Sequence, residues 1–495
     1  MGVPCSQNPK NAFFGGRTEA FWVLSAEAPI AYEDVTSLYL VVNSRMKYPV
    51  GHPTIIASGF LDVGEYFGFI KCAILPPENL FIPVLPMHAG PTKKLLFPLC
   101  RKCAESFQTK PCEHSAQERT MMGTWFSEEV KLAVKKGYMV QKIFSVWHFE
   151  QRSDKLFAEY MKTFYKLKLL STKLPSMSVE EKLRFIDDVE TREGMIIESV
   201  DDFVENPGLR QLTKLMLNNL WGRFGMTENL SKSKFCFDFE KLVEILSDKT
   251  LEVEAVRVVT TKAVQVVYRA ATVDHLATST DTNIFVAAAT TAWARIHLYG
   301  ELDKLGERAI YCDTDSVVYK KSSTASENLT LGNFLGEMTD ELDEGDHIVE
   351  FVTGGPKNYG YLTKDKKCVV KVKGFTLNCT NAPVFCFENV KRVVLKGVFA
   401  EEDEENPCER VTRKPAKQRK LDNNALQKTF LAQHLSSELP SALSDKEGIS
   451  VYNPWRILRT RKWDVMQAEE QKLYSFDFNK RIILSNLKTI PYGWR

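Results

Sequence analysis

Short apolar runs rich in β-branched and aromatic residues recur along this chain, and polar turns separate them. The clearest case is 309–319, AIYCDTDSVVY, where two apolar runs flank a turn made of Asp313, Thr314 and Asp315. Such runs around a short polar turn predict a β-hairpin, which here carries two carboxylates at its tip. A second apolar run ends at Asp34, and the residues after it have the pattern of the start of a helix.

Helical periodicity is clearest in 209–225. In this stretch Arg210, Lys214, Asn218 and Trp221 follow one another at intervals of four, four and three residues. Residues at these intervals share one face of a helix. The sequence therefore predicts a helix with a cationic and amide face.

The rest of the pattern predicts a mixture of helices and strands. We expect a Pro-rich, irregular region from about 60 to 145, and two helical stretches joined by a charged turn within 153–228. Pro207 marks the start of the helix described above, and Gly222 and Gly225 mark its end. Strands are predicted at 138–147 and 251–273, and an Ala-rich helix at 283–302.

Length and composition indicate a globular protein of several parts. At 495 residues the chain is too long for one compact core, so we expect two to four units. No apolar run approaches the roughly 18–20 residues that cross a bilayer, and no secretory signal follows Met1, so we expect an intracellular protein without membrane contact. The 11 cysteines are scattered, which suits a reducing compartment. A net charge of +2 leaves any nucleic-acid binding to local basic clusters.

Four soft metal ligands lie close together in one part of the sequence: Cys100, Cys103, Cys112 and His114. A C-x2-C pair is already a tight chelating geometry, and four such ligands in a reducing compartment predict structural Zn²⁺. The C-x-H end is not a common finger spacing. The alternative is four unrelated residues.

The carboxylates and the cationic helix face suggest chemistry with phosphates. Two carboxylates held close together repel each other, and a bound divalent cation offsets that repulsion; hard oxygen ligands favour Mg²⁺ or Mn²⁺. The alternative is an ordinary surface turn, because Asp and Thr are common turn residues. The cationic face of 209–225 suits a polyphosphate, and its alternative is a solvated amphipathic face.

Three of these segments, in this order, resemble the polymerase motifs of family B DNA polymerases. Motif A (D-x-x-S-L-Y-P) is similar to Asp34–Tyr39, motif B (K-x3-N-S-x-Y-G) to Lys214–Gly222, and motif C (Y-x-D-T-D-S) to Tyr311–Ser316. The chain departs from the motifs at three positions: Leu40, Asn219 and Trp221.

Further segments resemble the protein-primed branch of that family. GGPKNYGY at 354–361 is similar to its K-x-Y motif, and FFGG at 13–16 to its Y-x-G-G link between exonuclease and polymerase domains. YPVGHP at 48–53 and KGFTLN at 373–378 resemble polymerases of Polinton/Maverick transposons and related viruses. The resemblance covers nearly the whole chain.

This resemblance implies a template-directed DNA polymerase that adds deoxynucleotides to a 3′-hydroxyl by two-metal phosphoryl transfer. Two Mg²⁺ ions, for which Mn²⁺ can substitute, would be held by Asp34, Asp315 and the backbone carbonyl of Val35, while Asp313 would support the catalytic site. The implied partners are primer–template DNA, deoxynucleoside triphosphates and a terminal protein that supplies the priming hydroxyl. The implied setting is a self-replicating transposon or virus-like element, in the nucleus.

The resemblance also assigns binding roles. Lys214, Lys168 and Arg210, in that order, would meet the triphosphate, and Asn218 and Trp221 would lie under the nascent base pair. A helix turn beginning at Asp34 would carry the ring of Tyr39 beneath the incoming sugar, where it would exclude a 2′-hydroxyl. The residues implied to contact DNA are Gly15, Gly16, Thr314, Lys357, Tyr359 and Lys373.

The implied fold is α+β, a right-hand palm, fingers and thumb with two insertions and an antiparallel palm sheet. With little sequence before Asp34, we expect a polymerase module without an exonuclease domain, or a truncated gene model. The expected divisions are: 1–30, linker; 31–60, palm; 61–150, an insertion of the terminal-protein-region type that returns to the palm; 151–228, fingers; 229–282, second insertion; 283–390, palm; 391–495, thumb, with a mobile charged segment at 400–448.

Two other functions compete with this one. One is a catalytically impaired, domesticated relic that binds nucleic acid. The intact Asp34, Asp313, Asp315 and Lys214 argue against it, while the motif departures and the expected lack of an exonuclease domain keep it open. An RNA-templated polymerase usually carries adjacent aspartates, whereas Thr314 separates them here.

Overall fold

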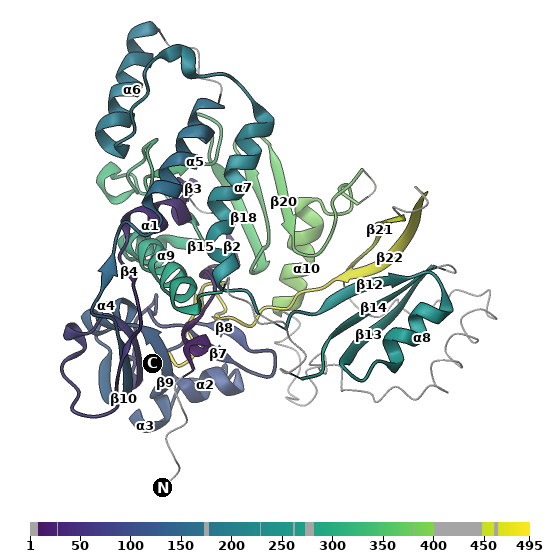
Figure 1. Cartoon of the computed structure of the whole chain (residues 1–495), viewed down its shortest axis with the longest axis horizontal. Helices are drawn as coiled ribbons and strands as arrows, with labels where there is room; N and C mark the ends of the chain where they lie inside the picture. The colour runs from purple at the N-terminus through teal and green to yellow at the C-terminus, as the bar shows by residue number, and fades with distance from the viewer. Residues whose placement is uncertain are drawn as a thin grey trace. The chain divides into compact units, whose positions relative to one another are not determined.

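The computed structural model describes residues 8–26, 28–172, 178–227, 229–260, 263–272, 282–379, 381–399, 448–459 and 464–495, without the side chains of 260 and 452–470 (Figure 1). The chain divides into two compact units. The first comprises Met1–Met226, Asp281–Lys371 and Phe478–Arg495, and the second Thr227–Thr280 and Val372–Asp477. The predicted mobile segment 400–448 lies, except for its last residue, outside the described residues.

A nine-stranded sheet forms the centre of the first unit. Its main path runs β1-β15-β16-β3-β18-β19-β20, while β17 pairs with β3 and β2 pairs with β18. The strand bounds are β1 Thr18–Ala20, β2 Leu24–Ser25, β3 Ile30–Val35, β15 Ala309–Asp313, β16 Ser316–Lys320, β17 Met338–Asp340, β18 Ile348–Gly355, β19 Asn358–Thr363 and β20 Cys368–Val372. The hairpin predicted at 309–319 is therefore confirmed as β15 and β16, which pair antiparallel.

The two faces of this sheet are buried differently. Alternating side chains of a strand point to opposite faces, so Tyr32 and Tyr311 pack in an aromatic cluster with Phe351. The other face belongs to the largest core, which includes Val317 and the long helix α9 (Ile284–Leu305). The predicted Ala-rich helix is thus confirmed, and its small side chains allow close packing behind the sheet.

A group of helices lies beside the sheet (Figure 1): α1 Leu38–Arg45, α5 Ala158–Leu170, α6 Val179–Glu193 and α7 Pro207–Phe224. The expectation of two helical stretches in 153–228 is wrong, because Ser178 caps a third helix with a capping box. Helix α7 begins at Pro207 after the cap Asn206, as predicted, but Gly222 lies inside it and Gly225 follows its last turn. A glycine within a helix weakens it without ending it.

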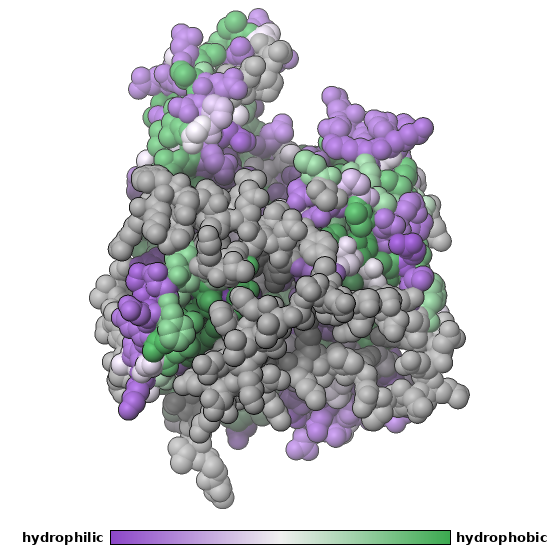
Figure 2. Space-filling model, turned by 90° about the vertical axis from the view of Figure 1, so that its right-hand side faces the viewer, coloured by the Kyte–Doolittle hydropathy of each residue, from purple (hydrophilic) through white to green (hydrophobic). Residues whose placement is uncertain are grey.

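Core packing joins all four of these helices. The buried cluster that they share includes Leu40 of α1, Met161 of α5, Val189 of α6 and Leu217 of α7. The first two turns of α6 nevertheless expose Val179 and Leu183, which are 69% and 54% accessible. Figure 2 shows hydrophobic and hydrophilic residues mixed at the upper end of the molecule, at the height where Figure 1 places α6.

The region from 60 to 145 contains long strands and three short helices between irregular stretches such as 76–86, which corrects part of our expectation. Its sheet has the order β5-β10-β6-β9, and Pro76, Pro77 and Pro86 lie between its strands rather than within them. The strand predicted at 138–147 is confirmed as β10. The strands of this sheet are β5 Thr54–Ile56, β6 Gly68–Leu75, β9 Met121–Phe126 and β10 Met139–His148, and the helices are α2 Arg101–Ser106, α3 Ala116–Arg119 and α4 Ser127–Lys135.

Three short strand pairs complete the first unit. They are β7 Met87–Ala89 with β8 Lys94–Leu96, β4 Tyr48–Pro49 with β11 Arg152–Ser153, and β23 Ile482–Ile483 with β24 Thr489–Ile490.

The second unit combines a three-stranded sheet with helices and a hairpin. The sheet has the order β12-β14-β13, and the strands predicted at 251–273 are confirmed within it. Its elements are β12 Lys232–Cys236, α8 Phe239–Ser247, β13 Leu251–Thr260, β14 Ala263–Ala270, α10 Phe387–Phe399, β21 Ile449–Arg459 and β22 Asp464–Tyr474. Antiparallel sheets mixed with helices confirm the predicted α+β class. Among the described residues, no helix has both the length and the hydropathy to cross a membrane.

Candidate active site

Two aspartates lie at the end of the central sheet, Asp34 in β3 and Asp315 in the turn that leads into the neighbouring strand β16. Ser316 of β16 is opposite Asp34 of β3, and the amide of Val35 donates to the carbonyl of Asp315 at 2.8 Å. The hairpin reverses tightly at Thr314, which has a left-handed φ of 65°. The structure therefore brings together Asp34 and Asp315, which are 281 residues apart in sequence.

The electrostatics of this pair fit a cation. Burial raises the pKa of Asp34 to about 7, and repulsion from Asp315 adds to the rise. Burial raises the pKa of Asp315 to about 6, with repulsion from Asp313 next. Among the described residues, Oδ1 of Asp34 is buried and has no hydrogen-bond partner. Half-buried carboxylates with a free oxygen suit a hard divalent ion, so this donor set fits Mg²⁺ or Mn²⁺.

Asp313 has a different environment from the other two aspartates. Its Oδ1 accepts from Thr18 Oγ1 at 3.0 Å and Thr314 Oγ1 at 3.1 Å, and forms an ion pair with Nζ of Lys357 at 3.3 Å. These contacts fix its carboxylate at the side of the hairpin. The arrangement suits the supporting role that the resemblance implies.

The predicted cations approach this pair from the helices. Nζ of Lys168 on α5 donates to Ser37 Oγ at 3.1 Å, and Nε of Arg210 on α7 donates to Thr172 Oγ1 at 3.2 Å. Burial lowers the pKa of Lys168 to about 8, and repulsion from Arg210 and Lys214 contributes. Lys214 also lowers the pKa of Asp34 by its charge. Cations gathered closely enough to repel one another favour an anionic ligand.

Tyr39 and Trp221 form a stacked pair at the crossing of α1 and α7. Their ring centroids are 4.7 Å apart and their planes differ by 21°. Burial raises the pKa of Tyr39 to about 12. The predicted helix start at Asp34 is wrong, since β3 continues through Val35 and α1 begins only at Leu38. Asn218 is exposed on α7.

The segment before β1 lies directly against the hairpin tip. The amide of Thr314 donates to the carbonyl of Arg17 at 2.7 Å, and a Cβ on Gly16 would lie 2.9 Å from Cγ2 of Thr314. Arg295, buried on α9, donates to the carbonyls of Phe14 and Gly15 at 2.6 and 2.8 Å. It also forms a two-pronged ion pair with Glu129 at 2.8 and 2.9 Å.

Sequence reasoning missed Arg295 and one acidic residue. The signal for Arg295 was an arginine inside an Ala-rich apolar helix, where a charge needs a buried partner. Exposed Glu341 lies close enough for its charge to raise the pKa of both Asp34 and Asp315. No pattern around Glu341 distinguished it from its acidic neighbours.

The two residues of the K-x-Y motif lie near the hairpin, Lys357 beside Asp313 and Tyr359 in the aromatic cluster of the sheet. Lys357 is exposed, and its amide donates to Tyr311 OH at 2.8 Å. Tyr359 is only 4% accessible, and its hydroxyl lies 3.1 Å from that of Tyr32. Lys373 belongs to the second unit.

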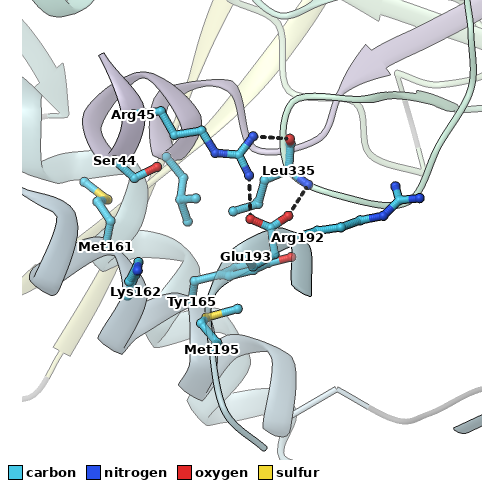
Figure 3. A pocket seen from close by; sticks show the side chains of 10 residues that line it. Ser44, Arg45, Met161, Lys162, Tyr165, Arg192, Glu193, Met195 and Leu335 are labelled. Atoms are coloured by element: carbon cyan, nitrogen blue, oxygen red, sulfur yellow. Dashed lines mark hydrogen bonds and ion pairs between the residues drawn. The ribbon is translucent and has the colours of Figure 1, made fainter. Parts of the chain in front are cut away.

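A small cavity of about 60 Å³ lies elsewhere in the first unit, between α1, α5 and the end of α6. Figure 3 shows Arg45 and the backbone of Leu335 meeting the carboxylate of Glu193. Nη2 of Arg45 donates to Oε2 of Glu193 at 2.6 Å, and the amide of Leu335 donates to its Oε1 at 3.0 Å. With both carboxylate oxygens bonded, these contacts connect α1 and α6 to the loop that precedes β17.

The four predicted soft ligands converge in three dimensions. The sulfur and nitrogen donors of Cys100, Cys103, Cys112 and His114 all lie within 4.8 Å of one another. Nδ1 of His114 is 3.6, 3.3 and 3.7 Å from the three sulfurs in that order. Tetrahedral zinc, with Zn–S of about 2.3 Å and Zn–N of about 2.0–2.1 Å, separates sulfur and nitrogen by about 3.5 Å.

A family model described as "DNA polymerase type B, organellar and viral" matches residues 5–183 and 198–305. The chain is 25% identical over 381 residues to a probable DNA polymerase of Neurospora intermedia, and 27% identical over 395 residues to one of Podospora anserina. Each match covers 74% of this chain but only 32% and 27% of those relatives, so the chain spans a third of their length or less.

Among solved structures, the chain is similar to Phi29 DNA polymerase complexed with primer-template DNA and incoming nucleotide substrates. That match has a TM-score of 0.54 at 14% identity and covers 94% of this chain and 62% of the other. A complex of the same polymerase with single-stranded DNA gives a TM-score of 0.50 at 16% identity, covering 77% and 56%. At such identities the likeness concerns the fold, which agrees with the predicted polymerase architecture.

Proposed function

The chain belongs to the type B DNA polymerases of organelles and viruses, and we propose that it is a template-directed DNA polymerase that extends a primer 3′-hydroxyl with deoxynucleotides. One observation carries the proposal: the half-buried pair Asp34 and Asp315 faces a group of cations on α5 and α7. Metal-binding carboxylates beside a triphosphate-binding surface are what nucleotidyl transfer requires.

In this proposal Asp34, Asp315 and the Val35 carbonyl hold the metal ions. When bound, two divalent ions activate the attacking hydroxyl and neutralise charge on the leaving pyrophosphate. Lys168, Arg210 and Lys214 bind and orient the triphosphate, whose negative charge the metal ions offset only in part. Asp313 keeps the hairpin tip in place through its contacts with Thr18, Thr314 and Lys357.

The stacked rings of Tyr39 and Trp221 would form one wall of the nucleotide site. A rigid aromatic surface beneath the sugar excludes a 2′-hydroxyl by collision, which can discriminate more strongly than a missing contact. The partners we propose are primer–template DNA and deoxynucleoside triphosphates, and the similarity to Phi29 DNA polymerase in complex with primer-template DNA and incoming nucleotide substrates supports both. The terminal-protein primer and the transposon setting rest on the sequence resemblance.

We also propose that Cys100, Cys103, Cys112 and His114 bind one structural Zn²⁺. The Nδ1 atom of His114 can form only one hydrogen bond, so hydrogen bonding does not explain its similar distances to three sulfur atoms. A metal ion shared by all four side chains does. Zinc analysis of protein purified without a metal-binding tag should give one equivalent. A Cys100→Ser/Cys103→Ser variant should lose it, while exposed Cys368 and Cys379, changed together to Ser, should leave it unchanged.

Primer extension with a matched pair of variants tests the polymerase proposal. Asp34→Asn should lower the extension rate roughly a thousandfold or more, because a metal ion contributes several kcal/mol of charge stabilisation. The control is Glu33→Gln. Glu33 is the preceding residue, and burial also raises its pKa to about 7, but its side chain points to the other face and accepts from Tyr319 at 2.7 Å.

Three outcomes separate the competing functions. Extension on DNA templates that fails in Asp34→Asn and survives in Glu33→Gln supports the proposal. Extension on RNA templates alone would identify an RNA-templated enzyme. Wild-type protein that binds DNA but never extends a primer, with Mg²⁺ or Mn²⁺, would identify a relic.

A further inference from the structure

We propose that the cysteine–histidine metal cluster secures the segment 479–495 against the central sheet, so that metal binding there positions the strand beside the candidate catalytic hairpin. The inference rests on the proposed zinc site and goes beyond it. It assigns the metal a positioning role for a second site instead of a purely local structural one.

Hydrogen bonds to backbone carbonyls join the cluster and this segment. Arg495 donates from Nε to the carbonyl of Cys112 at 2.9 Å and from Nη2 to the carbonyl of His114. The amide of Leu99 donates to the carbonyl of Tyr492 at 2.8 Å. Two of the acceptors of Arg495 are thus the carbonyls of candidate metal ligands, whose positions depend on the ligand loop being closed, and the third is the carboxylate of Glu78 at 2.9 Å.

Packing between the two parts is equally close. Gly493 has a φ of +89°, and a Cβ there would collide with Cβ and the backbone nitrogen of Cys100. Tyr492 and Ile482 share a buried cluster with Cys100, Cys103 and Cys112. A metal that draws the cysteines together therefore also shapes the surface on which 479–495 rests.

The same segment contacts the strand next to the catalytic hairpin. Thr489 donates from its amide to Phe21 at 2.8 Å and from Oγ1 to the carbonyl of Ala20 at 2.7 Å. Nζ of Lys480 donates to the carbonyl of Thr18 at 3.0 Å. Arg481, fully buried, lies 3.6 Å from the carboxylate of Glu19.

These contacts continue into the hairpin. In β1, Thr18 and Glu19 pair with Asp313 and Cys312 of β15, and Thr18 Oγ1 donates to Asp313 at 3.0 Å. The path from metal cluster to hairpin therefore consists of hydrogen bonds from side chains and backbone amides, together with the buried ion pair of Arg481 with Glu19. Since a structural zinc site is rarely formed without its metal, loss of zinc should loosen the ligand loop first and the rest of this path after it.

Hydrogen exchange of the whole chain, with zinc bound and after removal by a chelator, tests the coupling. We expect zinc removal to speed exchange at least fivefold in 479–495, in β1 and in 309–313, but not in α5 and α7, which lie outside this path. Faster exchange confined to 100–114 would overturn the proposal, and so would a chain that binds no zinc.

The reverse measurement uses variants of the segment. Coupling between two sites is reciprocal, so Arg495→Ala and Gly493→Val should each weaken zinc binding at least fivefold in competition with a chromogenic chelator. Arg101→Ala is the matched control: its guanidinium also bonds a backbone carbonyl near the cluster, that of Thr120, but has no described bond to 479–495. Equal zinc affinity in Arg495→Ala and wild type would overturn the coupling. Neither measurement needs polymerase activity, so failure of the proposed function would be seen separately in primer extension.

Discussion

Replacing Gly16 with alanine tests how tightly the segment before β1 fits against the hairpin tip. The added Cβ would lie 2.9 Å from both Cγ2 and Oγ1 of Thr314 and 3.2 Å from its Cβ, so one partner must move. Thr314 has little freedom to do so, because its amide is bonded to Arg17 at 2.7 Å and its Oγ1 to Asp313 at 3.1 Å. The displacement should therefore reach the hairpin tip that carries Asp315.

The size of the effect follows from the cost of overpacking. Adding a methyl group to a filled site costs about 1–3 kcal/mol. If the activation free energy of nucleotide addition rises by the same amount, kcat falls by about 5- to 150-fold. Primer extension should be measured at saturating primer–template, so that a loss of DNA affinity does not enter the comparison.

Two further variants make the result specific. Gly15→Ala adds the same methyl group one residue earlier, where no atom lies within 4 Å, and should leave kcat close to wild type. Thr314→Gly removes all three close contacts, and a φ of 65° suits glycine, so Gly16→Ala should have little further effect in that background. Equal losses in Gly15→Ala and Gly16→Ala, or no rescue by Thr314→Gly, would refute the reasoning.

Three further predictions concern the site itself. Asp315→Asn should abolish extension but leave DNA affinity, measured by fluorescence anisotropy, largely unchanged; normal extension would remove Asp315 from the metal site. Lys168, with a pKa of about 8, is charged below that pH and loses its charge above it, so the KM for deoxynucleotides should rise between about pH 7 and pH 9 in wild type. Lys168→Arg keeps its charge and should flatten this rise, whereas the same rise in both proteins would assign it to another group. Tyr39→Val should raise ribonucleotide incorporation relative to deoxynucleotide incorporation, and equal loss of both would mark Tyr39 as structural.

The hairpin and helix α7 could be predicted because their signals are local. Two apolar runs around Asp313 and Asp315 specify a hairpin without knowledge of its partners. Likewise, Pro207 at the first helical position marks the start of α7 in the sequence alone. The pairing of Asp34 with Asp315 required more, namely the order of three motifs that resemble a known family.

The errors arose where local signals had two meanings. Prolines between 60 and 145 suggested irregular structure, but Pro76 and Pro77 follow β6 directly and end it. Ser37 was expected inside a helical turn, yet it adopts a left-handed conformation with φ of 57°, which delays α1 until Leu38. In both cases the residue type marks an interruption without giving the length of the element beside it.

Long-range buried charges could not be predicted, although they restrain the strand that contacts the candidate site. Glu19 lies between Arg17, bonded at 2.7 Å through Nε, and Arg481, which is 462 residues away in sequence. No local pattern specifies such a partner. Breaking a buried ion pair leaves an uncompensated charge, so β1 cannot shift along β15 without that cost. Because β1 also carries Thr18, which bonds Asp313, a charge cluster far from the candidate metal site restrains the strand that contacts its hairpin.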